Sequence, residues 1–136
     1  MSYHFTIAYW ILLFAALLPL CCAGLAKWGM FTKARKDGGY DNHSPRQWLE
    51  RQQGWRARAN AAQANTFEAL PFFFAAVIIA HQLRAGQTML DLLCLTWLML
   101  RVFYIITYVG DMATPRSLIW AGALIVNIVI LFAGFR

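Results

Sequence analysis

The sequence predicts an all-α integral membrane protein, built as a bundle of four transmembrane helices. Of its 136 residues, 60% are hydrophobic and only 13% are charged, whereas a soluble domain carries about 25% charged residues. The apolar residues gather in four blocks, each close to the roughly 20 residues that a helix needs to cross a bilayer. Because these blocks use most of the chain, we expect a single membrane domain over residues 1–136.

The four predicted spans cover residues 5–26, 59–82, 89–109 and 117–135. The first span has no charge, and it is longer than the apolar core of a signal peptide, which has about 7–15 residues after a basic start. We therefore expect a permanent helix there. The second span carries Glu68, and the third carries Asp91 and Arg101. The fourth has no charge but contains Asn127.

The net charge of +6 is concentrated between the first and second spans, in the loop 27–58. That loop holds eight of the twelve Lys and Arg residues: Lys27, Lys33, Arg35, Lys36, Arg46, Arg51, Arg56 and Arg58. The second connection holds only Arg84, and the third only Arg116. Because an excess of Lys and Arg marks cytoplasmic loops, we expect the first and third connections inside and both termini outside. The same rule explains the positive charge without a nucleic-acid partner, and we expect none.

The large loop begins with residues that favour turns and continues with a basic, aromatic segment. The turn formers are Gly38, Gly39, Asp41, Asn42, Ser44 and Pro45. The segment 46–58 then mixes Trp48, Leu49 and Trp55 with arginines. This mixture is typical of an interfacial stretch, with tryptophan at headgroup level and arginine near anionic lipid. The alternative is that part of the basic cluster gathers an anionic ligand.

The cysteines and histidines do not form the signature of a metal or haem site. Cys21 and Cys22 are adjacent in the first span, and Cys94 lies in the third. An odd number of cysteines without metal-type spacing indicates free thiols. The three histidines are scattered along the chain at His4, His43 and His81. We therefore expect no bound metal and no haem.

Two charged residues lie deep in the predicted spans. A charge inside a membrane costs about 2.5–3.5 kcal/mol on insertion scales and by default marks function. Glu68 lies ten residues after Arg58, and Arg101 lies ten residues before Asp111, so both are about 15 Å from the predicted cytoplasmic edge. Asp91, in contrast, is close to the outer boundary. Glu68 and Arg101 are therefore placed to pair, within one chain or between neighbouring chains.

Polar neighbours extend this pair into a candidate site. Asn65 precedes Glu68 by three residues, so both share a helix face. Arg101, Tyr104 and Tyr108 are spaced three and four apart, and they form a polar stripe on the next span. We interpret this set as a cytoplasm-facing site for a small zwitterionic or anionic ligand. The alternative is a buried Glu–Arg pair that fixes helix packing without any chemistry.

These residues carry a resemblance to a known family. The segment 65–72 (NTFEALPF) resembles the N-x-x-E-x-x-P signature of the MAPEG family, the membrane-associated proteins in eicosanoid and glutathione metabolism. The segment 101–108 (RVFYIITY) resembles the family's R-x-x-Y/H-x-x-x-Y stretch, and residues 115–117 resemble its basic segment before the fourth helix. The resemblance extends to the four-span plan, the size and the large first loop. It implies a plain bacterial-type member that forms a homotrimer in the inner membrane.

The resemblance also implies glutathione as a co-substrate, bound between adjacent subunits toward the cytoplasmic side. Glu68 would bind its ammonium group, and Asn65 would bind a backbone or carboxylate group. Arg101 would hold Glu68 or a glutathione carboxylate. Tyr104 and Tyr108 would line the peptide.

By the same resemblance, Arg116 would be the catalytic residue. It would lie near the glutathione sulfur and favour the nucleophilic thiolate, since a nearby cation lowers the pKa of a thiol. The thiolate would attack a lipophilic electrophile that partitions from the bilayer, or reduce a lipid hydroperoxide. The resemblance thus implies a glutathione-dependent transferase or peroxidase.

Two positions depart from the family pattern. Ala61 stands where conjugating members usually carry arginine, and Ala69 stands where tyrosine is common. The bases nearest to Ala61 are Arg58 and Arg56, about one helical turn or more away, and we include Arg58 among the expected ligand-binding residues. The departures favour an alternative function, a non-catalytic membrane module that binds a ligand or scaffolds a partner. A small proton-coupled exporter is disfavoured because the first span contains no carboxylate.

Overall fold

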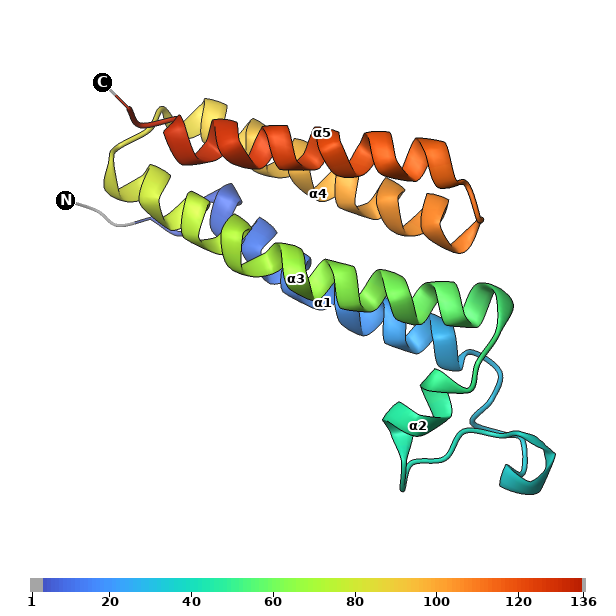
Figure 1. Cartoon of the computed structure of the whole chain (residues 1–136). Helices are drawn as coiled ribbons and strands as arrows, with labels where there is room; N and C mark the ends of the chain where they lie inside the picture. The colour runs from blue at the N-terminus through green and yellow to red at the C-terminus, as the bar shows by residue number, and fades with distance from the viewer. Residues whose placement is uncertain (1–3, 136) are drawn as a thin grey trace.

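The computed structural model describes residues 4–135, and every regular element in that range is helical (Figure 1). The helical segments follow one another as α1 (Ile7–Lys27), the 3₁₀ helix η1 (Arg35–Asp37), α2 (Pro45–Glu50), α3 (Gly54–Gln82), α4 (Gln87–Val109) and α5 (Ala113–Phe132). Within the described range, α1, α3, α4 and α5 are long and apolar enough to cross a membrane. The predicted all-α class with four apolar helices is confirmed, and the chain is an integral membrane protein.

The four long helices form two pairs. Helix α1 packs along α3, and α4 packs along α5, while α3 also contacts α4 and α5. We call the end that carries residues 27–58 and the turn 110–112 the loop end, and the opposite end, with the turn 83–86, the terminal end. Figure 1 shows that the two pairs lie close together at the terminal end and diverge toward the loop end. The space between α3 and the α4–α5 pair therefore widens toward the loop end.

The core between the pairs combines small residues with one large aromatic contact. The rings of Phe73 on α3 and Trp97 on α4 stack with centroids 3.7 Å apart and planes 3° apart. Alanines at completely buried positions, such as Ala15 and Ala76, let the backbones of α1 and α3 approach closely. This packing holds the helices that carry the candidate site in fixed register.

Three helices begin earlier than the hydropathy of the sequence predicts, α4 by two residues and α3 and α5 by more. Helix α3 begins at Gly54 rather than at residue 59, because the arginines of its first turns reach backbone carbonyls. Arg56 Nη1 donates to the carbonyls of Ala26 at 3.0 Å and Trp28 at 2.7 Å. Helix α5 begins at Ala113 rather than at residue 117, with Pro115 in a first turn whose N–H groups need no intrahelical acceptor. Hydropathy marks the apolar part of each helix, whereas these helices extend beyond it.

The terminal end is joined by polar contacts between the helices. Asp91 Oδ1 accepts the backbone N–H of Ala8 at 2.9 Å, and the Thr6 hydroxyl lies 3.0 Å from His81 Nε2. The ring of Tyr9 stacks on that of His81 at 4.2 Å. Because the first N–H groups of a helix lack internal acceptors, the Asp91 carboxylate stabilises the start of α1. Asp91 thus has structural partners at the terminal end, and the side of the membrane on which this end lies stays a prediction.

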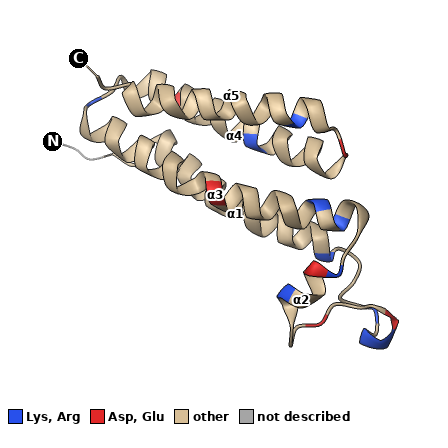
Figure 2. Cartoon of the chain, in the orientation of Figure 1, with Lys and Arg blue, Asp and Glu red and all other residues tan. Residues whose placement is uncertain are grey.

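At the loop end, α2 folds back against the ends of the long helices. Trp48 and Leu49 are buried beside Ala26 and Ala59, and Trp48 Nε1 donates to the carbonyl of Gly38 at 3.3 Å. The Trp48 side chain therefore packs in a small protein core, whereas Trp55 is exposed, and the position of segment 46–58 at the lipid interface stays a prediction. Figure 2 shows most charged residues gathered at the loop end, with long uncharged stretches in the four long helices.

Candidate functional site

Arg101 is the buried centre of the candidate site. Its side chain is only 1% exposed, and Nη2 donates to Asn65 Oδ1 at 3.0 Å and to Thr66 Oγ1 at 3.1 Å. The Thr66 hydroxyl itself donates to the carbonyl of Ala62 at 2.7 Å, which leaves a lone pair for the guanidinium. The guanidinium carbon also lies 4.3 Å from the centre of the Tyr104 ring. Arg101 is thus fixed by two neutral oxygens of α3 and by a ring of its own helix.

The expected ion pair between Glu68 and Arg101 is not formed within the chain. In the described residues, the carboxylates within 4.0 Å of a basic group are those of Asp41 and Asp111, and Glu68 is exposed. Glu68 is two residues from Thr66, about 200° around the helix, so the two side chains leave α3 in different directions. The neutral partners reach Arg101, and the carboxylate does not. Pairing between neighbouring chains stays a prediction.

The tyrosines predicted on one face of α4 form a continuous series with two arginines. The rings of Tyr104 and Tyr108 meet edge to face, with centroids 5.6 Å apart and planes at 81°. Arg101 lies over the first ring, and the guanidinium carbon of Arg116 lies 4.4 Å from the centre of the second. Such cation–π contacts orient both guanidinium groups. The series connects the middle of α4 with the first turn of α5, and so brings Arg116 into line with the other predicted residues.

A cavity of about 210 Å³ opens beside Arg101, between α3, α4 and α5. Its lining consists of Asn65, Glu68, Ala69 and Phe72 from α3, Trp97 and Arg101 from α4, and Trp120, Ala123, Leu124 and Asn127 from α5. Three predicted site residues therefore face one space: Asn65, Glu68 and Arg101. Tyr104, Tyr108 and Arg116 do not line this space; they continue from Arg101 toward the loop end.

Sequence reasoning did not place several lining residues in the site, among them Trp97 and the amide Asn127. Asn127 is 3% exposed, and its Oδ1 has no hydrogen-bond partner among the described residues. The sequence feature that could have indicated Asn127 is a single amide side chain among the apolar residues of the fourth span. The Thr66 contact with Arg101 gave no such signal, because a threonine in a helix commonly bonds to its own backbone.

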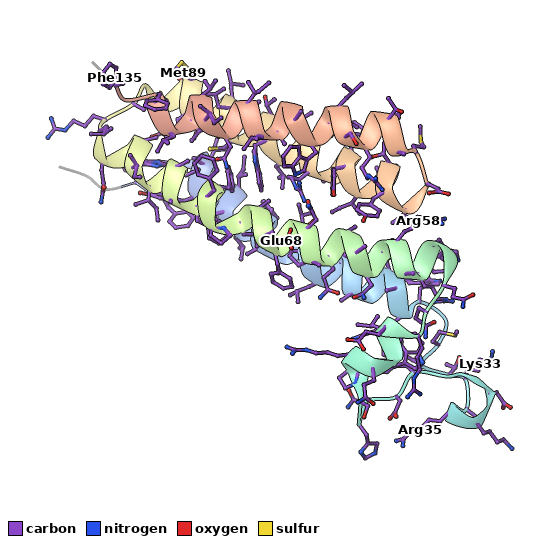
Figure 3. The ribbon with its side chains drawn as sticks, in the orientation of Figure 1. Lys33, Arg35, Arg58, Glu68, Met89 and Phe135 are labelled. Carbon is purple, nitrogen blue, oxygen red and sulfur yellow. The ribbon has the colours of Figure 1, made fainter. Side chains whose placement is uncertain are left out.

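Arg58 lies away from the cavity. Its Nε donates to the carbonyl of Val109 at 2.9 Å, and its Nη1 lies 3.9 Å from Asp111 Oδ2. In Figure 3, Arg58 lies near the loop end of α3, whereas Glu68 lies midway along the same helix. Arg58 therefore links the start of α3 to the end of α4, which is a structural contact between the two helix pairs.

Ala61 faces a second depression rather than the cavity. This groove of about 420 Å³ lies between α2 and α3, and its lining includes Arg46, Glu50 and Gln63. Within residues 4–135, no three His, Cys, Asp or Glu side chains gather in a way that could hold a metal ion. The chemistry of the described site is thus that of carboxylate, amide, guanidinium and phenol groups.

The chain matches no curated protein and no solved structure. The model of the MAPEG family, in contrast, matches residues 7–136, which is nearly the whole chain and includes all four long helices. Both motif segments lie inside the matched range, on α3 and α4. The resemblance that these segments carry is confirmed, and the chain is a membrane protein of the MAPEG family.

Proposed function

We propose that the protein is a glutathione-dependent transferase or peroxidase that acts on lipophilic electrophiles. In this proposal, three chains assemble as a homotrimer in a bacterial inner membrane, with the loop end in the cytoplasm and glutathione bound between subunits. The observation that carries the proposal is the series Arg101–Tyr104–Tyr108–Arg116, together with a Glu68 that forms no ion pair within residues 4–135. Membership of the MAPEG family supports the same conclusion.

Glutathione carries two carboxylates, one ammonium group and one thiol, and the site offers a partner for each. Glu68 is exposed and forms no ion pair in the described chain, so its carboxylate is free to bind the ammonium group. Asn65 Oδ1 is occupied by Arg101, which leaves the Asn65 amide N–H groups to donate to a carboxylate or a backbone carbonyl. Arg101 Nη1 makes no hydrogen bond in residues 4–135 and is the nitrogen that would hold a carboxylate.

Arg116 is the proposed catalytic residue. It is partly exposed and oriented by Tyr108, so its positive charge can lie beside a thiol that rests along the tyrosines. A nearby cation favours the thiolate, which is the nucleophilic form. The thiolate would form a carbon–sulfur bond to the electrophile as the leaving group departs with the electron pair. With a lipid hydroperoxide, the thiolate sulfur would take up the terminal oxygen as the O–O bond breaks, which releases the alcohol and leaves glutathione sulfenic acid. A second glutathione would then form glutathione disulfide and water.

The proposal is tested by measuring glutathione conjugation to a reactive aryl halide with the purified protein in lipid vesicles. Arg116→Ala and Glu68→Gln should each lower the rate, through loss of the thiolate and loss of the ammonium partner. The matched controls Arg51→Ala and Glu50→Gln change exposed residues of the loop end, and they should keep the wild-type rate. No conjugation by the wild type, or equal rates in all four variants, contradicts the proposal.

A second candidate function is a non-catalytic membrane module that binds a ligand or scaffolds a partner. The observation in its favour concerns Arg58, which donates to the carbonyl of Val109 and lies near Asp111. Its side chain therefore does not take the place of the arginine that conjugating members carry at the position of Ala61. Calorimetry separates the two functions. Catalysis requires glutathione binding, whereas a scaffold gives no heat of binding with glutathione and co-purifies with a stoichiometric partner.

A further inference from the structure

The groove of about 420 Å³ between α2 and α3 is separate from the cavity beside Arg101. The charged residues in its lining are Arg46 and Glu50, both from α2. The other lining residues are small, apolar or amide side chains: Leu49 from α2, and Ala57, Asn60, Ala61, Gln63, Ala64 and Phe67 from α3. Among the described residues, none of those proposed to bind glutathione lines this groove, so its occupant is a separate question.

The two charges of the groove are available to a ligand. Arg46 and Glu50 are exposed, and neither forms an ion pair within residues 4–135. They are four residues apart on α2, so their side chains leave the same face of the helix about one turn from each other. The order of arginine before glutamate is the less favourable one for pairing along a helix. One cation and one anion on a single wall therefore match a ligand that carries both charges.

The groove lies along the part of α3 where the apolar span begins. Its α3 lining extends from Ala57 to Phe67, ten residues or about 15 Å along the helix, and hydropathy predicts that the span starts at residue 59. Figure 1 shows α2 beside the loop-end part of α3, and the two helices are in contact. The alanines give this face of α3 a low profile, and Phe67 is 48% exposed. Lipid headgroups and acyl chains are thus the molecules at hand on this side of α3.

The wall that carries the two charges is held in place by its buried side. Trp48 and Leu49 of α2 are 7% and 9% exposed, and they pack in one cluster with Ala26 and Ala59 of the long helices. Because α2 is anchored in this way, its backbone need not become ordered when a ligand binds. Preorganisation of this kind lowers the entropic cost of binding.

We propose that this groove binds phosphatidylethanolamine, with the phosphate on Arg46, the ammonium group on Glu50 and the acyl chains along the alanines of α3. A guanidinium group forms paired, charge-assisted hydrogen bonds to a phosphate, and a primary ammonium group donates to a carboxylate. Phosphatidylcholine cannot make the second contact, because its trimethylammonium group has no N–H. Phosphatidylglycerol has no cation and would place an anionic headgroup beside Glu50.

Native mass spectrometry of the purified protein in detergent, without glutathione, measures the dissociation constant of each lipid. The probes are phosphatidylethanolamine, phosphatidylcholine and phosphatidylglycerol with identical acyl chains. Phosphatidylethanolamine should bind about tenfold more tightly than either of the others, since a hydrogen bond to a charged group accounts for about a tenfold change. Equal affinities for phosphatidylethanolamine and phosphatidylcholine overturn the inference. Displacement of the bound lipid by glutathione also overturns it, because the groove would then be a glutathione site.

Two variants separate the roles of the charges. Glu50→Gln keeps the size of the side chain and should bind phosphatidylethanolamine and phosphatidylcholine with equal affinity. Arg46→Gln should weaken both lipids by a similar factor, because both carry the phosphate. The matched controls Arg51→Gln and Asp37→Asn change exposed residues outside the groove, and they should keep the wild-type preference. A preference for phosphatidylethanolamine that survives Glu50→Gln overturns the inference.

A second copy of the chain is the alternative occupant of the groove. After Cys21, Cys22 and Cys94 are replaced with alanine, Ala64→Cys places a thiol in the groove at an exposed position. The inference predicts that oxidation in the membrane links no two copies through this residue. A disulfide between two copies shows that protein covers the groove, and it overturns the inference.

Lipid binding at the groove does not depend on the proposed function. Conjugation of glutathione without a preference for phosphatidylethanolamine refutes only the lipid site. A preference for phosphatidylethanolamine without glutathione binding refutes only the glutathione chemistry.

Discussion

Arg101 on α4 donates to Asn65 Oδ1 on α3 at 3.0 Å, so a buried cation fixes the orientation of an amide on the neighbouring helix. The same nitrogen donates to Thr66, which makes the interaction a fork between two side chains of α3. Because Arg101 is neutralised by no carboxylate within the described chain, its positive charge remains available to an anionic ligand. The two motif segments are thus joined in the structure by this one contact.

Replacing Arg101 with lysine should weaken both the fold and the site. A lysine ammonium keeps the charge but lacks the planar guanidinium that lies over the Tyr104 ring and holds Nη2 between Asn65 and Thr66. We expect a loss of about 2 kcal/mol in the free energy of unfolding, since a hydrogen bond to a buried charged group contributes about 1.5–3 kcal/mol. Thermal unfolding in detergent measures the change, with Arg84→Lys as the exposed control. A wild-type melting temperature in Arg101→Lys contradicts the fork.

Arg58→Ala should loosen the loop end. The variant removes the donor to the carbonyl of Val109 and the 3.9 Å contact with Asp111, both of which join α3 to the end of α4. The side chain is partly exposed, so we expect a modest cost of about 1 kcal/mol. Hydrogen exchange of residues 107–112 should become faster, while residues 87–97 keep their protection. Unchanged exchange at the end of α4 indicates that the contacts of Arg58 do not stabilise the loop end.

Asp91→Leu should destabilise the start of α1. The carboxylate accepts the N–H of Ala8 and also the side-chain N–H of Gln87 at 2.7 Å. Loss of a side-chain acceptor at a helix start costs about 1 kcal/mol. Asp91→Asn keeps an acceptor oxygen and should retain most of the stability. Equal melting temperatures for the leucine and asparagine variants contradict a role for the acceptor.

The proposed orientation predicts which end of the bundle faces the cytoplasm. After Cys21, Cys22 and Cys94 are replaced with alanine, Asn42→Cys at the loop end and Arg84→Cys at the terminal end provide two exposed reporters. A thiol reagent that does not cross membranes should label only the second reporter from outside intact cells. Labelling of the first reporter from outside contradicts the orientation inferred from the excess of Lys and Arg.

The main features of the fold were predictable because they follow from local rules. Hydropathy alone identified four apolar helices. The spacing of Arg101, Tyr104 and Tyr108 predicted that these three residues share one face of a helix, and in the structure Tyr104 contacts both Arg101 and Tyr108. Helix starts were less predictable, because the first turn of α3 is basic. It is helical since Arg56 and Arg58 bind carbonyls that are distant in the sequence.

The pairing within the site was not predictable from depth. Glu68 and Arg101 lie at matching depth along their helices, yet Arg101 bonds to Thr66 and Asn65 instead. Depth depends on residue number, whereas the choice of partner depends on the rotation of α3 about its axis, which tertiary packing sets. Asn127 was not predictable as a lining residue for a related reason, because only the packing of α5 against α3 and α4 brings it to the cavity that Arg101 also lines.

The central claim is that the protein binds glutathione as a thiolate beside Arg116. The most direct test is the ultraviolet difference spectrum on mixing glutathione with the purified protein at neutral pH, because the thiolate absorbs where the thiol does not. The account predicts a thiolate band with the wild type and with Arg51→Ala, and none with Arg116→Ala. The absence of a band in the wild type, or an equal band in Arg116→Ala, would contradict it.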